Sequence, residues 1–131
     1  MELRGVLTPE ALADWQVTQP VVLTLMVMMV LDVAMGLVCA IGLKTVSSTA
    51  SFRGMSKKAA MLLIVAVAVA LDPFMPNVVL GKLVALFYCT TEGLSILENA
   101  GRAGVPLPSW LKDSLAKLKP AAPKEAAKEN A

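Results

Sequence analysis

Hydrophobic residues along the chain are gathered into three blocks rather than spread at amphipathic spacing. The block over residues 20–43 contains one charge, Asp32, whereas residues 59–71 contain none and residues 78–97 contain Lys82 and Glu92. About 20 apolar residues cross the hydrocarbon of a bilayer. The pattern therefore predicts transmembrane helices over about 20–43, 59–75 and 78–97, and the second block needs its flank to Met75 to reach the lower length limit.

The segments outside these blocks are polar or of low complexity. We expect an all-α integral membrane protein with three transmembrane helices, a short interfacial C-terminal helix and a disordered tail. Thr8 and Pro9 are typical of a helix start within the N-terminal segment. Leu111, Leu115 and Leu118 share one face of the C-terminal helix. The predicted divisions are an external segment over 1–19, a transmembrane domain over 20–97 that includes a polar loop over 44–58, a cytoplasmic interfacial segment over 98–119 and a disordered tail over 120–131.

Loop charge indicates an orientation for the helices. The 44–58 segment carries the basic residues Lys44, Arg53, Lys57 and Lys58, and the tail from residue 98 carries six more Lys and Arg residues. The segments 1–19 and 72–77 carry one basic residue between them. By the positive-inside rule, the N-terminus is predicted outside, and the 44–58 loop and the C-terminus in the cytoplasm.

Composition restricts the chemistry. The chain has no histidine, which removes the commonest general base and metal ligand. Its two cysteines, Cys39 and Cys89, lie inside apolar blocks without CxxC spacing and are read as small buried hydrophobes. We therefore expect neither metal nor Ser-His chemistry, and no cofactor.

Small residues recur at every fourth position on two of the predicted helices. Such stripes let helices approach closely in lipid, where no hydrophobic drive brings them together. The stripes can serve packing within one chain or self-association, and the sequence leaves both alternatives open. The residues concerned are Gly36, Ala40, Gly81, Ala85, Cys89 and Gly93.

Three charged residues lie within the apolar blocks. A charge inside a membrane faces protein or water and is a functional hypothesis by default, which makes Asp32, Glu92 and Lys82 candidates for intramembrane polar or pore-lining roles. Lys82 lies near the outer end of its helix, where Asp72 is its expected partner. Asp32 and Glu92 fall at similar depths, and we expect both to be partly protonated in a dry bundle and ionised when water enters.

Three stretches of the sequence carry a resemblance to a known family. They are LDVAMGLVCA, SSTASFRGMSKKA and FYCTTEGLSILENAGRAGVPLPSWLKDSL, and together they resemble the toxin-secretion/phage-lysis holin family over residues 20 to 118. Val33 departs from the pattern, since relatives often carry an aromatic residue there. The matching residues are Asp32, Gly36, Ser48, Gly54, Lys58, Glu92, Ser95, Glu98, Asn99, Gly104 and Pro106.

The resemblance implies a small non-enzymatic protein of the bacterial cytoplasmic membrane. Holins oligomerise there and open lesions that release an endolysin or a toxin. The family motif places Ser95, Glu98, Asn99, Gly104 and Pro106 at the cytoplasmic exit of the last helix. The implied partners are membrane lipid, further copies of the chain and, functionally, an endolysin or exported toxin, with no nucleic acid. The alternatives are a small proton-coupled transporter subunit, which normally shows repeats or broken helices, and a membrane-anchoring scaffold protein.

The predicted orientation is testable by cysteine labelling. Gly5→Cys is expected to react with an impermeant thiol reagent in intact cells, because residue 5 precedes the first helix on the outside. Glu125→Cys is expected to react only after permeabilisation. Equal labelling at both positions in intact cells would contradict an N-out, C-in protein with three spans.

Overall fold

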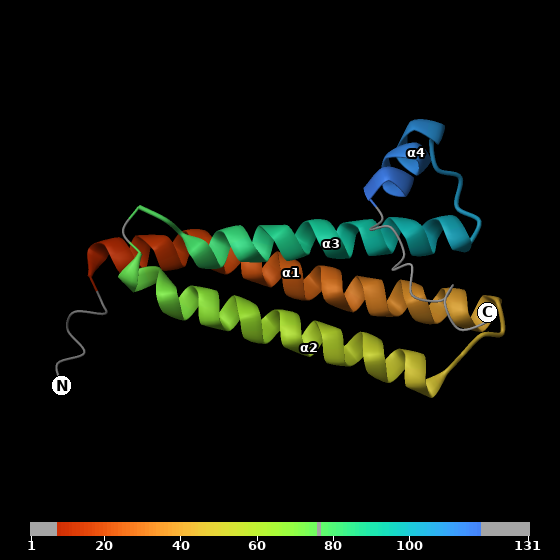
Figure 1. Cartoon of the computed structure of the whole chain (residues 1–131), viewed down its shortest axis with the longest axis horizontal. Helices are drawn as coiled ribbons and strands as arrows, with labels where there is room; N and C mark the ends of the chain where they lie inside the picture. The colour runs from red at the N-terminus through yellow and green to blue at the C-terminus, as the bar shows by residue number, and fades with distance from the viewer. Residues whose placement is uncertain (1–7, 76, 119–131) are drawn as a thin grey trace, which may run out of the picture.

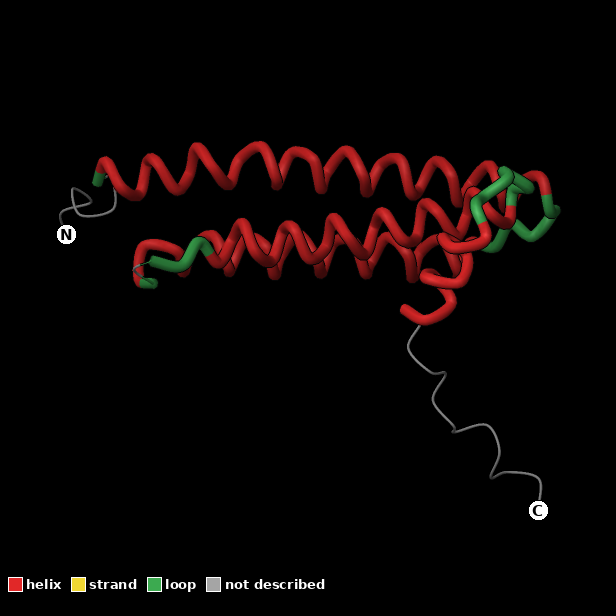
Figure 2. The backbone as a smooth tube through the Cα atoms, turned by 90° about the horizontal axis from the view of Figure 1, so that it is seen from above, coloured by secondary structure: helices red, strands yellow, loops and turns green. Residues whose placement is uncertain are grey.

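The computed structural model describes residues 8–75 and 77–118, and its long helices form an up-down-up bundle (Figure 1). Helices α1 (Pro9–Gly42) and α3 (Leu80–Arg102) run in the same direction, and α2 (Ser48–Leu71) returns between them in the chain. A single 3-10 turn, η2 (Asp72–Phe74), follows α2, and the short helix α4 (Ser109–Leu118) follows α3. The prediction of an all-helical protein is confirmed (Figure 2). The tail predicted to be disordered, residues 120–131, lies outside the described residues.

Three of the helices are long and apolar enough to cross a membrane, as the sequence predicts. The candidate spans are Leu12–Gly42, Ser48–Phe74 and Leu80–Arg102. Even the last span, with 23 residues, is about 35 Å long at 1.5 Å per residue, against about 30 Å of hydrocarbon. Large apolar side chains such as Val30, Leu63 and Phe87 point outward and are exposed, as suits contact with lipid.

Helix α1 joins two segments that the sequence separates. It begins at Pro9, which confirms the helix start at Thr8-Pro9, but it continues through Pro20 to Gly42. The predicted division between a surface segment and the first span at residue 20 is therefore not marked by a break in the helix, and it stays a prediction. Proline lacks the N–H that would bond the carbonyl four residues back, a loss that the apolar residues beyond it outweigh.

Helix α2 also begins earlier than predicted, at Ser48 rather than at about residue 59. Ser47 caps it, since its side-chain oxygen accepts a hydrogen bond from the Ala50 N–H at 3.4 Å. Most of the predicted 44–58 loop is therefore helical, and Arg53, Lys57 and Lys58 lie on α2. The connection is shorter, and Lys44 lies within it with a left-handed φ of 53°.

Helix α3 extends beyond its predicted end at residue 97 to Arg102. It closes with a Schellman motif, in which the Val105 N–H donates to the Ala100 carbonyl at 3.0 Å and the Gly104 N–H donates to the Gly101 carbonyl at 3.2 Å. Gly104 has a φ of 84°, which favours glycine. Gly104 therefore ends the helix at the exit where the family motif places it, whereas Gly101 remains helical.

The packed centre of the bundle is small and uses all three long helices. Leu25 and Met29 of α1, Val65 of α2 and Ala85 of α3 form the buried cluster. Helix α3 packs against both α1 and α2. It is therefore the central element of the bundle, and its small residues lie where the other two helices approach.

Residues of both small-residue stripes face neighbouring helices within the chain. A Cβ on Gly81 would lie 2.6 Å from Val69 Cγ2, one on Gly93 would lie 3.2 Å from Met28 Cε, and one on Gly36 would lie 3.7 Å from Asn99 Nδ2. Ala85 is fully buried. Of the two alternatives, this geometry favours packing within one chain at these positions.

The contact at Gly81 gives a stability prediction. Gly81→Ala is expected to lower the free energy of unfolding by about 1–2 kcal/mol, because the new methyl meets both the side chain and the backbone of Val69, and the gain in helix propensity offsets only part of that cost. Unfolding of the purified chain in mixed micelles measures the change. Gly54→Ala is the matched control, since nothing lies within 4 Å of its Cβ position, and it is expected to stabilise. Equal effects of the two changes would contradict the close approach.

Candidate functional site

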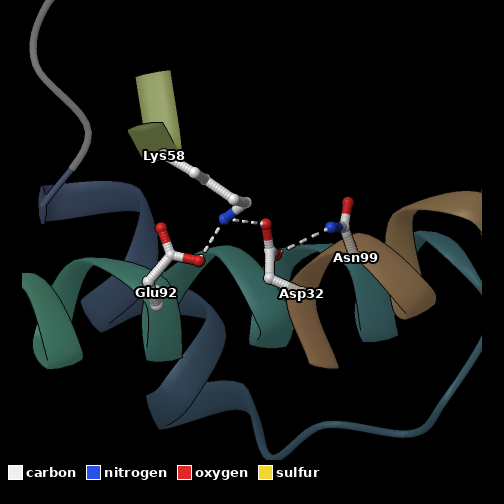
Figure 3. Close-up of polar contacts among 4 residues, drawn as sticks. All are labelled: Asp32, Lys58, Glu92 and Asn99. Atoms are coloured by element: carbon white, nitrogen blue, oxygen red, sulfur yellow. Dashed lines mark hydrogen bonds and ion pairs between the residues drawn. The ribbon is translucent and has the colours of Figure 1, made fainter. Parts of the chain in front are cut away.

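The side-chain amino group of Lys58 lies between two carboxylates inside the helical bundle (Figure 3). Its Nζ is 2.9 Å from Asp32 Oδ2 and also pairs with Glu92 Oε2. Asp32 comes from α1, Lys58 from α2 and Glu92 from α3. One cation therefore joins all three long helices, and we call Asp32, Lys58 and Glu92 the charged cluster.

The three residues meet because of where they lie along their helices. Each is about ten residues, or about 15 Å, from the end of its helix at the turn between α1 and α2: Asp32 from Gly42, Lys58 from Ser48 and Glu92 from Arg102. The antiparallel course of α2 brings its early residues to the level of the late residues of the other two helices. The expectation that Asp32 and Glu92 share a depth agrees with this geometry.

Asn99 extends the cluster along α3. Its Nδ2 donates to Asp32 Oδ1 at 3.3 Å, so the two oxygens of Asp32 have different partners. Its backbone carbonyl accepts a hydrogen bond from the Cys39 thiol at 3.0 Å. Gly36 leaves room for this contact, since a Cβ there would lie 3.7 Å from Asn99 Nδ2. The face of α1 that carries Asp32, Gly36 and Cys39 thus packs against the last turns of α3.

The side chains of the charged cluster are largely buried, and their formal charges do not cancel. The exposed fractions of the Lys58, Asp32 and Glu92 side chains are 14%, 12% and 4%. With all three ionised, two negative charges face one positive charge. A buried charge without a partner is costly, so Lys58 is the group on which both acids depend.

Lys58 supplies a positive charge beside Asp32 and Glu92, which the expectation of partly protonated acids did not include. The sequence-based hypothesis treated Asp32 and Glu92 as like charges that need protons in the closed state, and it placed Lys58 in a loop that sets topology. Residues 48–58 contain no proline and follow a serine that can cap a helix, and these two features are the sequence signal that α2 begins at Ser48 and that Lys58 lies on a helix.

Five residues on which the family resemblance rests converge at this one place. They come from three separate stretches of the chain, which the sequence alone does not bring together. The five residues are Asp32, Gly36, Lys58, Glu92 and Asn99.

Other predicted site residues lie away from the cluster. Asp72, the expected partner of Lys82, instead accepts a hydrogen bond from the Gly81 N–H at 2.9 Å, and no described acid pairs with Lys82. Ser95 and Glu98 are half-buried on α3, and Pro106 is exposed in the connection to α4. Ala40 is half-buried, and the Cys89 thiol faces the Val21 carbonyl at 3.8 Å.

Two hollows flank the bundle. An apolar groove of about 770 Å³ lies between α1 and α2, at the level of Trp15 and Val69. A smaller one of about 430 Å³ separates the end of α3, with Glu98 and Arg102, from α4. Over residues 8–75 and 77–118, the structure groups no three His, Cys, Asp or Glu side chains that could hold a metal ion.

The fold and the cluster define a small polytopic membrane protein with an internal charge network. Over residues 15–120, the chain matches the model of the bacteriophage holin family. It is 37% identical over 99 residues to an uncharacterised protein of Clostridium perfringens strain 13, covering 74% of this chain and 73% of that protein. It is 36% identical over 92 residues to a probable holin of Bacillus phage phi105, covering 70% of this chain and 68% of that protein. No solved structure matches the chain.

The chain therefore belongs to the bacteriophage holin family. Members of this family are non-enzymatic proteins of the cytoplasmic membrane, and the three candidate spans agree with that location. Family membership favours a holin over the transporter and scaffold alternatives.

The charge balance of the cluster predicts unequal effects of removing its members. Lys58→Met leaves two carboxylates without a cation and is expected to cost about 3–5 kcal/mol of stability. Asp32→Asn is expected to cost less, because Lys58 and Glu92 remain as a balanced pair and Asn can still contact Asn99. Unfolding in mixed micelles measures both.

The neighbouring residue Lys57 supplies a matched control, since it is exposed on the same helix. Lys57→Met is expected to leave stability nearly unchanged. Adding Glu92→Gln to Lys58→Met is expected to restore part of the loss, because it removes one of the two unpaired charges. A loss from Lys57→Met as large as that from Lys58→Met would contradict the specific role of the cluster.

Proposed function

We propose that this protein is a holin that assembles with further copies of itself in the cytoplasmic membrane and opens lesions through which an endolysin reaches the cell wall. The observation that carries the proposal is membership of the bacteriophage holin family over residues 15–120. The match to a probable phage holin, over about two thirds of each chain, supports the same assignment. For a holin encoded beside a toxin gene, the corresponding role is to release that toxin through the same lesions.

The charged cluster supplies a reason for the chain to remain closed before assembly. Lys58 holds α2 against α1 and α3 through two ion pairs that are shielded from their surroundings. Ion pairs in a low-dielectric environment are stronger than those in water, so they resist separation of the helices until water reaches them. Opening a lesion then requires the three helices to rearrange around groups that water can solvate.

The alternative is a proton-coupled transporter, because proteins of that class also carry charged residues inside the membrane. Transporters of that kind typically bind substrate at broken helices near the midplane. Helix α2 runs unbroken from Ser48 to Leu71 and α3 from Leu80 to Arg102, and each places its cluster residue within a continuous helix. These unbroken helices favour the holin assignment.

Controlled expression in a bacterial host tests the proposal. Induction of this chain together with a cytoplasmic endolysin is expected to halt growth abruptly and lyse the culture, because the enzyme gains access to the wall. Induction of the chain alone is expected to halt growth without clearing the culture. Endolysin alone is expected to do neither.

The release of a cytoplasmic reporter enzyme into the medium is the second measurement. A lesion wide enough for an endolysin is expected to release it together with the lytic activity. Growth arrest with the endolysin and reporter both retained inside would contradict a holin and favour a channel or transporter for small solutes.

A further inference from the structure

The first half of α2 is the polar part of a candidate membrane span. Residues 48–58 carry four hydroxyl groups and three cations, whereas residues 59–71 are apolar throughout. Thr49, Arg53, Ser56 and Lys57 are exposed. Figure 1 shows the first half of α2 running alongside α1 and α3 and diverging from them toward its beginning, and Lys58 at the end of this polar half pairs with both of these candidate spans.

The charged cluster fixes the depth of this polar segment relative to α1. Since Lys58 pairs with Asp32 and the two helices are antiparallel, residues before Lys58 lie at the level of residues after Asp32. Arg53 falls about 8 Å beyond the cluster, as does Leu37, and Thr49 falls about 14 Å beyond it, as does Ile41. Each polar residue of α2 thus has an apolar residue of α1 at its own level.

The two surfaces at this level have opposite chemistry. Leu37, Val38 and Ile41 are more than half exposed and suit a hydrocarbon environment. From Pro20 to Ile41, α1 measures about 32 Å, which matches the hydrocarbon thickness of a bilayer. The polar side chains of α2 therefore lie at membrane depth, where lipid cannot solvate them.

The helix turns four of its polar side chains, Thr49, Arg53, Ser56 and Lys57, out of the direction in which Lys58 points. Lys58 points inward to the two acids, and at 100° per residue Ser56 and Thr49 lie about 160–180° from it around the helix. Arg53 lies on the same outward side. One side of each molecule is therefore polar and basic at a depth where the α1 side is apolar.

We infer that this outward face of α2, formed by Thr49, Arg53 and Ser56 with Lys57 beside them, lines the water-filled interior of the assembled lesion, while α1 faces lipid at the same depth. The inference rests on the proposed function, since it requires several copies around water. It assigns the lumen to one helix and gives the lesion a basic inner wall near its cytoplasmic side. Each copy contributes the cations of Arg53 and Lys57 to that wall.

Cysteine accessibility in assembled lesions tests the assignment. Cys39 and Cys89 are first replaced by Ser, and lysis by this background is measured. Thr49→Cys and Ser56→Cys then probe the α2 face, and Ile41→Cys and Ala34→Cys probe exposed positions of α1 at the matching depths. A charged thiosulfonate that does not cross membranes is added to cells before and after lesions open.

After opening, the two α2 cysteines are expected to react at least about tenfold faster than their α1 counterparts, because the reactive thiolate forms in water and not in lipid. Equal rates at matched depths would overturn the inference and place this part of α2 outside the hydrocarbon. Protection of both α2 positions during normal lysis would also overturn it, by showing that protein covers the face. Reporter release is scored in the same cultures, so failure of the lumen assignment and failure of the lytic function remain distinguishable.

Discussion

The pairing of Lys58 with Asp32 and Glu92 is the interaction on which the arrangement of the bundle depends. In a membrane, apolar side chains give little preference for a neighbouring helix over lipid, so packing of small residues and polar contacts must hold the helices together. The buried apolar cluster is correspondingly small, with Leu25, Met29, Val65 and Ala85 at its centre. A charge network that reaches all three helices adds the directional contact that this small core lacks.

The same network sets the register of the helices. Sliding α2 along its neighbours by one turn, about 5.4 Å, would take the Lys58 amino group away from the acids and leave charges unpaired in a low-dielectric environment. Close contacts at Gly81 and Gly93 are satisfied in the register that the ion pairs select. Small-residue packing and charge pairing therefore favour one arrangement, in which Asn99 also reaches Asp32.

The sequence predicted the parts of this structure that follow from local pattern, and missed those that depend on tertiary pairing. The three apolar blocks, the helix start at Pro9 and the helix end at Gly104 are local signals, and the structure confirms them. The first half of α2 was read as a loop because its hydroxyl and basic residues are typical of loops, although nothing in its backbone chemistry prevents a helix. Lys58 acquires its partners only once that segment is helical, so the site was predicted from its acids and without its cation.

Lys58 lies at the border between the polar and apolar halves of α2, and this position connects the bundle to the lesion that we propose. The apolar half, residues 59–71, is about 20 Å long and too short to cross the bilayer alone. A cation costs up to about 2.5–3.5 kcal/mol on insertion, the value at the helix centre, whereas each Val, Leu or Ile returns only about 0.3–0.6 kcal/mol. The acids of α1 and α3 neutralise Lys58, but they do not reach Arg53 or Lys57 on the outward side. Within one copy, the acids neutralise one of the three cations of α2. In the proposed lesion, water shared among copies would solvate Arg53 and Lys57, and this solvation would favour the assembled state over a copy surrounded by lipid.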